Sequence, residues 1–406
     1  MKYAAHLLLL FVLTLPVRAA EFEAVSPESV GFDAKKLAAI DDAMQAHVDE
    51  GRIVGCSALV VRDGKVAYFR TWGDADREQQ KPMTDDAIFR IYSMSKPITS
   101  VAVMQLVEQG KLDLDDPISK YLPELADMKV LVVERDDDGK ETFEEVAAQR
   151  EITPRDLLRH TSGFTYGFFG NSEVDKRYLQ AGILRTGETI ADMVSKLGKI
   201  PLKHQPGTRW EYSVSTDVLG RLVEVVSGER YDEYLNQHIF EPLKMTDTFF
   251  SVPRDKQDRL AQLYTGDGDK LKTAESVRSR RFVNPTRFFS GGGGLCSTAG
   301  DYLRFCQMML NEGELDGARV LKPETVRQMI TNQLTDDIQR RPGLDFGLGF
   351  AISPEGRYSW GGAAGTRFWI DPENKIIGQF MIQIIPYENR NFGDRMREMV
   401  YAALVE

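Results

Sequence analysis

Cysteine is scarce in this chain of 406 residues, which has three, at positions 56, 296 and 306. Three scattered cysteines are too few for a disulfide framework and lack the paired spacing of a zinc site. We therefore expect Cys56, Cys296 and Cys306 to be small buried apolar residues. Because their number is odd, an exported form of the chain would keep at least one thiol free.

Positive charge is also in short supply. The chain has 51 Lys and Arg residues against 61 Asp and Glu residues, which gives a formal net charge of −10. No Lys- or Arg-rich run offers a local attraction for a phosphate backbone, so a nucleic-acid partner is not expected. The histidines at positions 47, 204 and 238 stand alone in the sequence, so we expect no metal site. We expect no cofactor either.

Long apolar runs are missing from most of the chain. The run at the N-terminus, from Leu7 to Val17, follows a positive start at Lys2 and precedes small residues at Ala19 and Ala20. It is too short to span a bilayer as a helix, and its layout is typical of a secretory signal peptide. We expect cleavage after Ala19, so that residues 1–19 are the signal peptide. The mature protein is then exported, periplasmic or secreted, and has no stable membrane span.

Hydrophobic periodicity predicts strands towards both ends of the chain and helices in its middle. The expected helices lie at 32–50, 97–108, 153–158, 188–197, 216–226 and 392–404, and the expected strands at 53–61, 66–72, 347–352, 358–360, 366–370 and 375–385. A polar stretch at 134–140 is expected to be a solvated loop. Thr298 and Asp301 are expected to form a capping box for a helix that runs through Met309.

The order of these elements predicts an α+β fold. A single hairpin is too small to be stable alone, so the early and late strands are expected to join in one antiparallel sheet. The sheet lobe then consists of residues 20–92 and 285–406, with helices flanking the sheet, and the inserted, mainly helical lobe consists of residues 93–284. A cleft between two such lobes is the usual place for a small-molecule site.

Ser93-Met94-Ser95-Lys96 is the segment with the clearest chemical meaning. It follows a strand-like stretch and opens an apolar helix whose start is fixed by Pro97, since proline is tolerated only in a first turn. Ser93 and Lys96 are three residues apart, close enough to meet on one face if the helical turn includes both. A serine hydroxyl is a poor nucleophile until a base takes its proton, and a nearby lysine can be that base.

Two further motifs follow along the chain, Tyr212-Ser213-Val214 and Trp360-Gly361-Gly362. In this order the three motifs resemble those of the serine β-lactamase and penicillin-binding-protein superfamily. Residues 157–163, 291–299 and 346–350 resemble its class C branch, and the whole combination is most similar to the family VIII carboxylesterases. The resemblance runs from about residue 30 to the C-terminus and implies a β-lactamase/transpeptidase-like fold.

The resemblance implies a role for each motif. Ser93 would be the acylated nucleophile and Lys96 its base partner, while Tyr212 would carry the proton to the leaving group and activate the deacylating water. Backbone N–H groups of Ser93 and Ala363 would form the oxyanion hole. Substrate contacts would come from the strand motif, at Trp360, Gly361 and Gly362.

Two departures from the β-lactamase pattern bear on the substrate. Trp360 stands where the family usually has the lysine of Lys-Thr-Gly, and Val214 stands where β-lactam hydrolases often have an asparagine. Both changes replace polar recognition by apolar surface, which favours a neutral ester over an anionic lactam. Arg367 is a candidate replacement cation, so Val214 and Arg367 join the candidate substrate-binding residues.

The sequence therefore predicts an exported serine hydrolase that forms an acyl-enzyme with small-molecule esters of short to medium acyl chains, with weak β-lactam hydrolysis as a side activity. Two alternatives stay open. One is a β-lactamase or D-amino-acid peptidase acting on cell-wall-type amides, and the other is a catalytically silent penicillin-binding-like protein. His160 is not expected to serve a Ser-His-Asp triad, because the sequence has no Gly-x-Ser-x-Gly elbow. No feature of the sequence predicts an oligomeric state.

Overall fold

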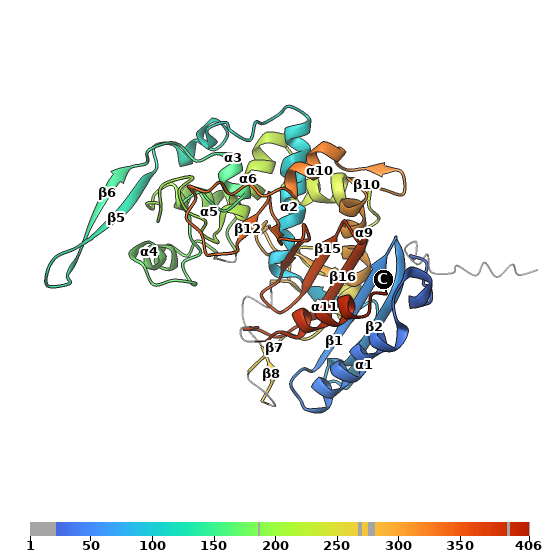
Figure 1. Ribbon diagram of the computed structural model, residues 1–406. Coiled ribbons are helices and arrows are strands. Elements are labelled where there is room, and N and C mark those ends of the chain that lie inside the picture. Colours follow the sequence, from blue (N-terminus) through green and yellow to red (C-terminus); the bar gives the residue numbers. More distant parts are fainter. Residues whose placement is uncertain (1–21, 186, 267–269, 275–280, 388–389, 406) are drawn as a thin grey trace, which may run out of the picture.

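The computed structural model describes residues 22–405, apart from 186, 267–269, 275–280 and 388–389 (Figure 1). The expected signal peptide, residues 1–19, lies outside the described residues. Within the described part of the chain, no helix combines the length and the apolar character needed to cross a bilayer.

An eight-stranded antiparallel sheet forms the centre of the molecule, in the order β12-β13-β14-β15-β16-β1-β2-β3. The N-terminal part of the chain supplies β1 (Gly55–Arg62), β2 (Lys65–Asp76) and β3 (Lys81–Pro82). The C-terminal part supplies β12 (Asp345–Phe346), β13 (Ala351–Ile352), β14 (Tyr358–Gly361), β15 (Arg367–Asp371) and β16 (Ile376–Ile382). Strand β1 pairs with β16, with Cys56 opposite Ile382. The predicted joining of early and late strands is confirmed, whereas the lobe boundaries stay a prediction.

Both faces of this sheet are covered. On one face, α1 (Ala34–Asp49) and α11 (Phe392–Ala402) pack against alternate side chains of β1 and β16 (Figure 1). On the other face, α9 (Ala299–Leu310) contacts β15 and β16. Side chains of a strand point alternately to the two faces, so a strand buried on both sides is apolar throughout. This burial explains why the sequence identifies β1 and β16 as strands.

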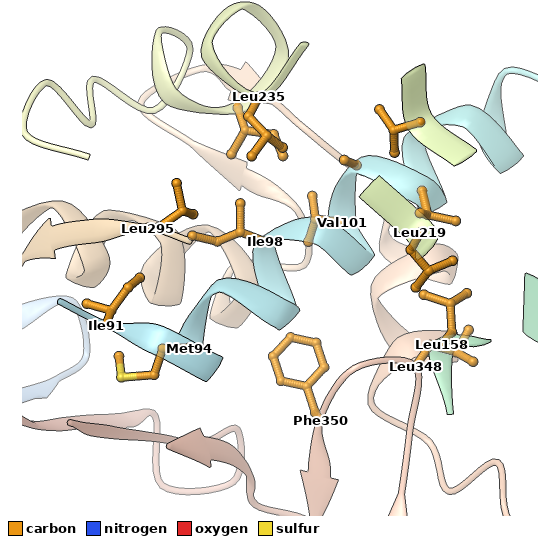
Figure 2. Packing of buried hydrophobic residues seen from close by; sticks show 14 of the residues in the cluster. Ile91, Met94, Ile98, Val101, Leu158, Leu219, Leu235, Leu295, Leu348 and Phe350 are labelled. Carbon is orange, nitrogen blue, oxygen red and sulfur yellow. The ribbon is translucent and has the colours of Figure 1, made fainter. Parts of the chain in front are cut away.

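Helix α2 (Ser95–Glu108) runs through the core between the sheet and the other helices, and it is buried from Ser95 to Leu106. A helix that is apolar all round is stable only inside a core. Figure 2 shows Ile98 and Val101 of α2 among core side chains that include Leu219, Leu235, Leu295 and Phe350. In the part of the chain that the structure describes, the other α-helices are α3 (Pro154–Leu158), α4 (Glu173–Ala181), α5 (Ile190–Leu197), α6 (Ser215–Ser227), α7 (Tyr231–Leu235) and α10 (Pro323–Met329).

The middle of the chain contains more strand than the sequence predicts. The predicted solvated loop is confirmed for residues 136–140, which form an exposed turn, whereas residues 134 and 135 end a strand that the sequence analysis missed. This turn joins β5 (Lys129–Arg135) and β6 (Glu141–Ala147) in a hairpin that projects from the body of the molecule (Figure 1). Acidic side chains and exposure of most of the hairpin hide the usual apolar alternation. Three short pairs also form, namely β4 (Ile88–Arg90) with β9 (Cys296–Thr298), β7 (Tyr264–Thr265) with β8 (Lys272–Thr273), and β10 (Glu314–Leu315) with β11 (Ala318–Arg319).

Two smaller expectations have different outcomes. All three cysteines are free and buried, as predicted. The capping box at the start of α9 is only half formed: the Thr298 side chain accepts the N–H of Asp301. The Asp301 carboxylate does not reach back to Thr298 but accepts hydrogen bonds from the Asp247 N–H at 2.7 Å and the Thr248 hydroxyl at 2.9 Å. Asp301 therefore ties α9 to the preceding loop.

Candidate active site

Ser93 lies at the junction between a strand and the central helix. Strand β4 leads into a short 3-10 turn, Tyr92–Met94, and α2 begins at Ser95 with Pro97 in its first turn. Tyr92 has a left-handed backbone conformation (φ 42°), which is unusual for a residue with a side chain and often accompanies a functional constraint. This local geometry leaves Ser93 half-buried and places Lys96 in the buried first turn of α2.

The Lys96 Nζ atom lies among oxygen atoms that carry no full charge. Its Nζ contacts Ser93 Oγ at 3.2 Å, the Tyr166 hydroxyl at 2.9 Å and the Gly292 carbonyl oxygen at 2.6 Å. The side chain is 1% exposed, and no carboxylate in the described part of the chain forms an ion pair with it. Lys96 is thus held within proton-transfer distance of Ser93 by two further contacts.

Tyr212 completes this group from the other side of Ser93. Its hydroxyl donates a hydrogen bond to Ser93 Oγ at 2.6 Å, and the centroid of its ring lies 4.6 Å from Lys96 Nζ. The ring packs against Trp210 and Trp360, with centroid distances of 6.3 and 5.6 Å. The structure therefore brings together the three residues that the sequence selects as catalytic.

The turn between β14 and β15 approaches the nucleophile closely. A Cβ atom added to Gly362 would lie 2.4 Å from the carbonyl oxygen of Ile91, two residues before Ser93. Ala363, the next residue, lines the same cavity as Ser93. Neither the N–H of Ser93 nor that of Ala363 donates to an acceptor in the described part of the chain, so both are available to a substrate oxyanion. Only glycine fits at 362, as expected where a backbone must be approached closely.

Two predicted substrate contacts are not at the cavity. The prediction that Val214 contacts the substrate is wrong, because this side chain is fully buried at the N-terminus of α6 and packs in the core. The prediction that Arg367 supplies a cation to the substrate is also wrong, because its guanidinium pairs with Asp394 on α11, on the far face of the sheet. Trp360 and Gly361 lie beside the site rather than along the cavity wall. The Trp360 ring supports Tyr212, and its indole N–H has no partner among the described residues.

Two residues that the sequence analysis missed hold Lys96 in place. Tyr166 contacts Lys96 directly, and burial, followed by Tyr212 and Asp217, raises the pKa of its phenol well above the usual value. Asp217 acts through the backbone: its Oδ1 accepts the Ser290 hydroxyl and the Gly292 N–H, and Gly292 in turn accepts Lys96. Tyr166 lies three residues after the His-Thr-Ser-Gly stretch, and Asp217 lies in the first turn after Tyr212, so motif proximity was the available signal.

His160 is a structural residue, as predicted. It is 1% exposed and lies behind Tyr212, with the two ring centroids 5.0 Å apart. Burial, and then the charge of Lys96, hold its pKa well below the usual value, so the imidazole is neutral. Its Nδ1 faces the Ser213 hydroxyl at 3.4 Å, and no described carboxylate pairs with it as a triad would require.

These residues open onto a cavity of about 790 Å³. Its wall includes Ser93, Tyr166, Tyr212 and Ala363, together with the aromatic pair Phe168 and Phe169. The volume is in the range that accommodates a small organic ligand. Within the described residues, no group of three or more His, Cys, Asp or Glu side chains could hold a metal ion.

The family model described as Beta-lactamase matches residues 40–401. This chain belongs to the beta-lactamase family. Its family membership agrees with the order of the motifs and with the sheet topology, so the predicted resemblance and the predicted fold class are confirmed.

Relatives of this beta-lactamase-family protein include esterases. An uncharacterized protein of Mycobacterium tuberculosis is 37% identical over 371 residues, which cover 85% of this chain and 90% of the relative. Esterase EstB of Burkholderia gladioli is 30% identical over 376 residues, covering 86% of this chain and 90% of the esterase. Among solved structures, EstCE1, a hydrolase with promiscuous acyltransferase activity, is 28% identical with a TM-score of 0.78, covering 92% and 99% of the two chains. The protein is a serine hydrolase.

Proposed function

We propose that this protein is an exported carboxylesterase that cleaves small-molecule esters of short to medium acyl chains through an acyl-enzyme. One observation carries the proposal: Ser93 Oγ is contacted at once by Lys96 Nζ at 3.2 Å and by the Tyr212 hydroxyl at 2.6 Å. Nucleophile and base within hydrogen-bond reach are the signature of covalent catalysis by serine. The esterase names of EstB and EstCE1 support the ester as substrate.

In the acylation step, Ser93 Oγ attacks the ester carbonyl carbon while its proton passes to Lys96 or, through the Tyr212 hydroxyl, towards the leaving group. The carbonyl oxygen becomes an oxyanion that accepts the N–H groups of Ser93 and Ala363. Each such donor contributes roughly 3–4 kcal/mol to transition-state stabilisation. Collapse of the tetrahedral intermediate breaks the bond to the alcohol oxygen, and Tyr212 protonates that oxygen.

In the deacylation step, a water molecule takes the place of the alcohol beside Tyr212. Tyr212 and Lys96 accept its proton as its oxygen attacks the acyl carbon. The second tetrahedral intermediate expels Ser93 Oγ, which recovers a proton from the same pair. The carboxylic acid leaves, and no cofactor is needed at any step.

The apolar surroundings support an ester over a cell-wall amide. Trp360 stands in place of the lysine of Lys-Thr-Gly and packs against Tyr212, so this strand offers no cation to a lactam carboxylate. We therefore expect β-lactam hydrolysis to be weak. A catalytically silent protein would not need Ser93, Lys96 and Tyr212 in mutual contact.

The test uses mature protein (residues 20–406) with p-nitrophenyl butyrate and a chromogenic cephalosporin. Ser93→Ala is expected to lose ester hydrolysis by about 10³-fold or more, and Tyr212→Phe by about 10²-fold or more. Ser95→Ala is the matched control, since Ser95 lies in the same tetrapeptide but its hydroxyl accepts the Leu295 N–H inside the core. Intact mass after treatment with a fluorophosphonate is expected to show one adduct on the native protein and on Ser95→Ala, and none on Ser93→Ala.

Three results would contradict the proposal in different ways. Unchanged ester hydrolysis by Ser93→Ala would show that Ser93 is not the nucleophile. Rapid cephalosporin turnover with negligible esterase activity would replace the substrate class by the β-lactam alternative. Absence of an adduct on folded native protein would favour the silent alternative. For export, N-terminal sequencing of the protein from a periplasmic or culture fraction is expected to begin at Ala20, and a full-length cytoplasmic product would refute it.

A further inference from the structure

The charge of the active-site cavity differs in sign from that of the whole chain. The whole chain carries a net charge of −10, yet the charged side chains in the described part of the cavity wall are one acid, Asp217, and two bases, Lys272 and Arg281. A cleft lined by one sign of charge concentrates ligands of the opposite sign. The charge that this wall presents to a ligand therefore depends on the contacts and the exposure of each of the three side chains.

The Asp217 carboxylate is buried, and one of its two oxygens makes hydrogen bonds within the protein. The side chain is 1% exposed, and its Oδ1 accepts both the Ser290 hydroxyl and the Gly292 N–H. These contacts position Gly292, whose carbonyl oxygen accepts Lys96. The Asp217 Oδ2 has no hydrogen-bond partner among the described residues, but it is buried, so the carboxylate borders the cavity wall without being exposed in it.

The two bases are placed differently. Arg281 is half-buried and anchored, because its Nη2 donates to the Gly293 carbonyl oxygen at 2.6 Å and its guanidinium lies 4.6 Å from the centroid of the Phe282 ring. Lys272 is exposed on the short strand β8. No carboxylate within the described ranges forms an ion pair with Lys272.

The apolar part of the wall comes from other segments. Phe168 and Phe169, whose ring centroids are 4.4 Å apart, extend the aromatic surface of Tyr166, and Leu184 lies nearby in the wall. Phe169 is 62% exposed, which is unusual for so large an apolar side chain beside a catalytic tyrosine. A substrate that satisfies both parts of the wall is an amphiphile with an apolar body and a negative group.

We propose that Lys272 and Arg281 form an anion-recognition site in the wall of the active-site cavity, and that the preferred substrate is an ester bearing a carboxylate. The proposal rests on the proposed esterase function. It replaces the expectation of a neutral ester, which followed from the loss of the strand lysine at Trp360. The two bases belong to β8 and to the segment before the Gly291–Gly294 turn, and neither belongs to the strand that carries Trp360.

Three p-nitrophenyl esters with six-carbon acyl chains test the proposal: the neutral hexanoate, the anionic monoadipate and the cationic 6-aminohexanoate. In low salt, native protein is expected to show kcat/KM for the adipate at least about tenfold above that for the 6-aminohexanoate. Lys272→Glu is expected to lower the adipate-to-hexanoate ratio of kcat/KM about tenfold and to raise the 6-aminohexanoate-to-hexanoate ratio. Salt at 0.5 M is expected to reduce these contrasts, because exposed charges are screened.

The matched control is Lys270→Glu, which makes the same charge change two residues away, at an exposed position that is not in the cavity wall. It is expected to leave both ratios unchanged. Arg281→Gln provides a second variant and is expected to lower the adipate ratio further when combined with Lys272→Glu. Thermal unfolding of each variant establishes that the folded proteins are compared.

The outcomes separate this inference from the proposed function. Equal adipate-to-hexanoate ratios in native protein and Lys272→Glu would overturn the anion site while leaving the esterase intact. An equal shift in Lys270→Glu would also overturn it, since the effect would then come from overall charge. If native protein hydrolysed none of the three esters in a Ser93-dependent way, the esterase function and this inference would both be overturned.

Discussion

Gly362→Ala is expected to lower kcat/KM for ester hydrolysis about 100-fold, because the added methyl group would push the β14–β15 turn away from the nucleophile. The new Cβ would lie 2.4 Å from the Ile91 carbonyl oxygen and 2.2 Å from Thr366 Oγ1. Ordinary contact begins near 3.4 Å, so the two backbones must separate by about 1 Å in a core that deforms little. A displacement of about 1 Å at a catalytic group costs about 10²-fold in rate, which corresponds to about 2.7 kcal/mol.

The chain supplies a matched control at the preceding residue. A Cβ added to Gly361 would meet the Thr366 carbonyl oxygen at 3.3 Å and Arg367 Nε at 3.9 Å, contacts that a small adjustment relieves. Neither glycine has a positive φ, so the pair differs in close approach and not in backbone strain. Steady-state hydrolysis of p-nitrophenyl butyrate is expected to show a loss mainly in kcat for Gly362→Ala, because the oxyanion exists only after attack. Gly361→Ala is expected to stay within about threefold of the native protein.

Two results would refute this reasoning. If Gly362→Ala kept kcat/KM within about threefold, the contact with Ile91 would not position the oxyanion hole. If Gly361→Ala lost as much activity as Gly362→Ala, any side chain on this strand would be harmful and the short distance would explain nothing. Thermal unfolding and fluorophosphonate labelling, both done below the unfolding transition, separate a misplaced oxyanion hole from an unfolded protein.

Three further predictions follow from the site and its surroundings. Asp217→Ala is expected to lower kcat about tenfold and to cost about 1–3 kcal/mol of stability, because Ser290 and Gly292 lose a buried acceptor; steady-state kinetics and urea unfolding check both. Phe169→Ala is expected to raise KM for p-nitrophenyl octanoate about fivefold more than for the acetate, since the exposed ring offers apolar surface to the longer chain. Burial raises the pKa of Asp301 from 3.8 to about 6, so the folded state binds this proton more tightly than the unfolded state. The resulting stabilisation is present below about pH 4 and is lost, by about 3 kcal/mol in full, as the pH rises to about 6; urea unfolding at several pH values is expected to show that Asp301→Asn removes this contribution.

The contact between Ser93 and Lys96 could be predicted because its signal is local. Ser93 and Lys96 are one helical turn apart, and Pro97 fixes where the helix begins, so four residues of sequence define their geometry. Tyr166 and Asp217 could not be found in the same way, because they reach Lys96 through contacts between segments far apart in the chain. Their proximity to known motifs becomes informative only when the fold is in view.

The wrong predictions concern the direction in which a side chain points. Val214 and Arg367 lie in or beside the motifs, but the backbone turns Val214 into the core and the alternation of β15 turns Arg367 towards α11. A shift of one residue in a strand moves a side chain to the opposite face, and motif matching does not determine that choice. The β5–β6 hairpin was missed because β6 is acidic and almost wholly exposed, so it lacks the apolar pattern that identifies β1 and β16.

The pairing of β1 with β16 has a consequence for the synthesis of the protein. Cys56 can pair with Ile382 only after nearly the whole chain has been made. Until then, the edge of β1 that pairs with β16 has no partner strand. Ala363 reaches Ser93 at the same late stage, because it belongs to the hairpin that precedes β16. A nascent or prematurely terminated chain therefore contains Ser93 and Lys96 but lacks Ala363, the second donor of the proposed oxyanion hole. With the proposed oxyanion hole incomplete, such a chain is expected to be inactive, and its unpaired strand is expected to favour aggregation.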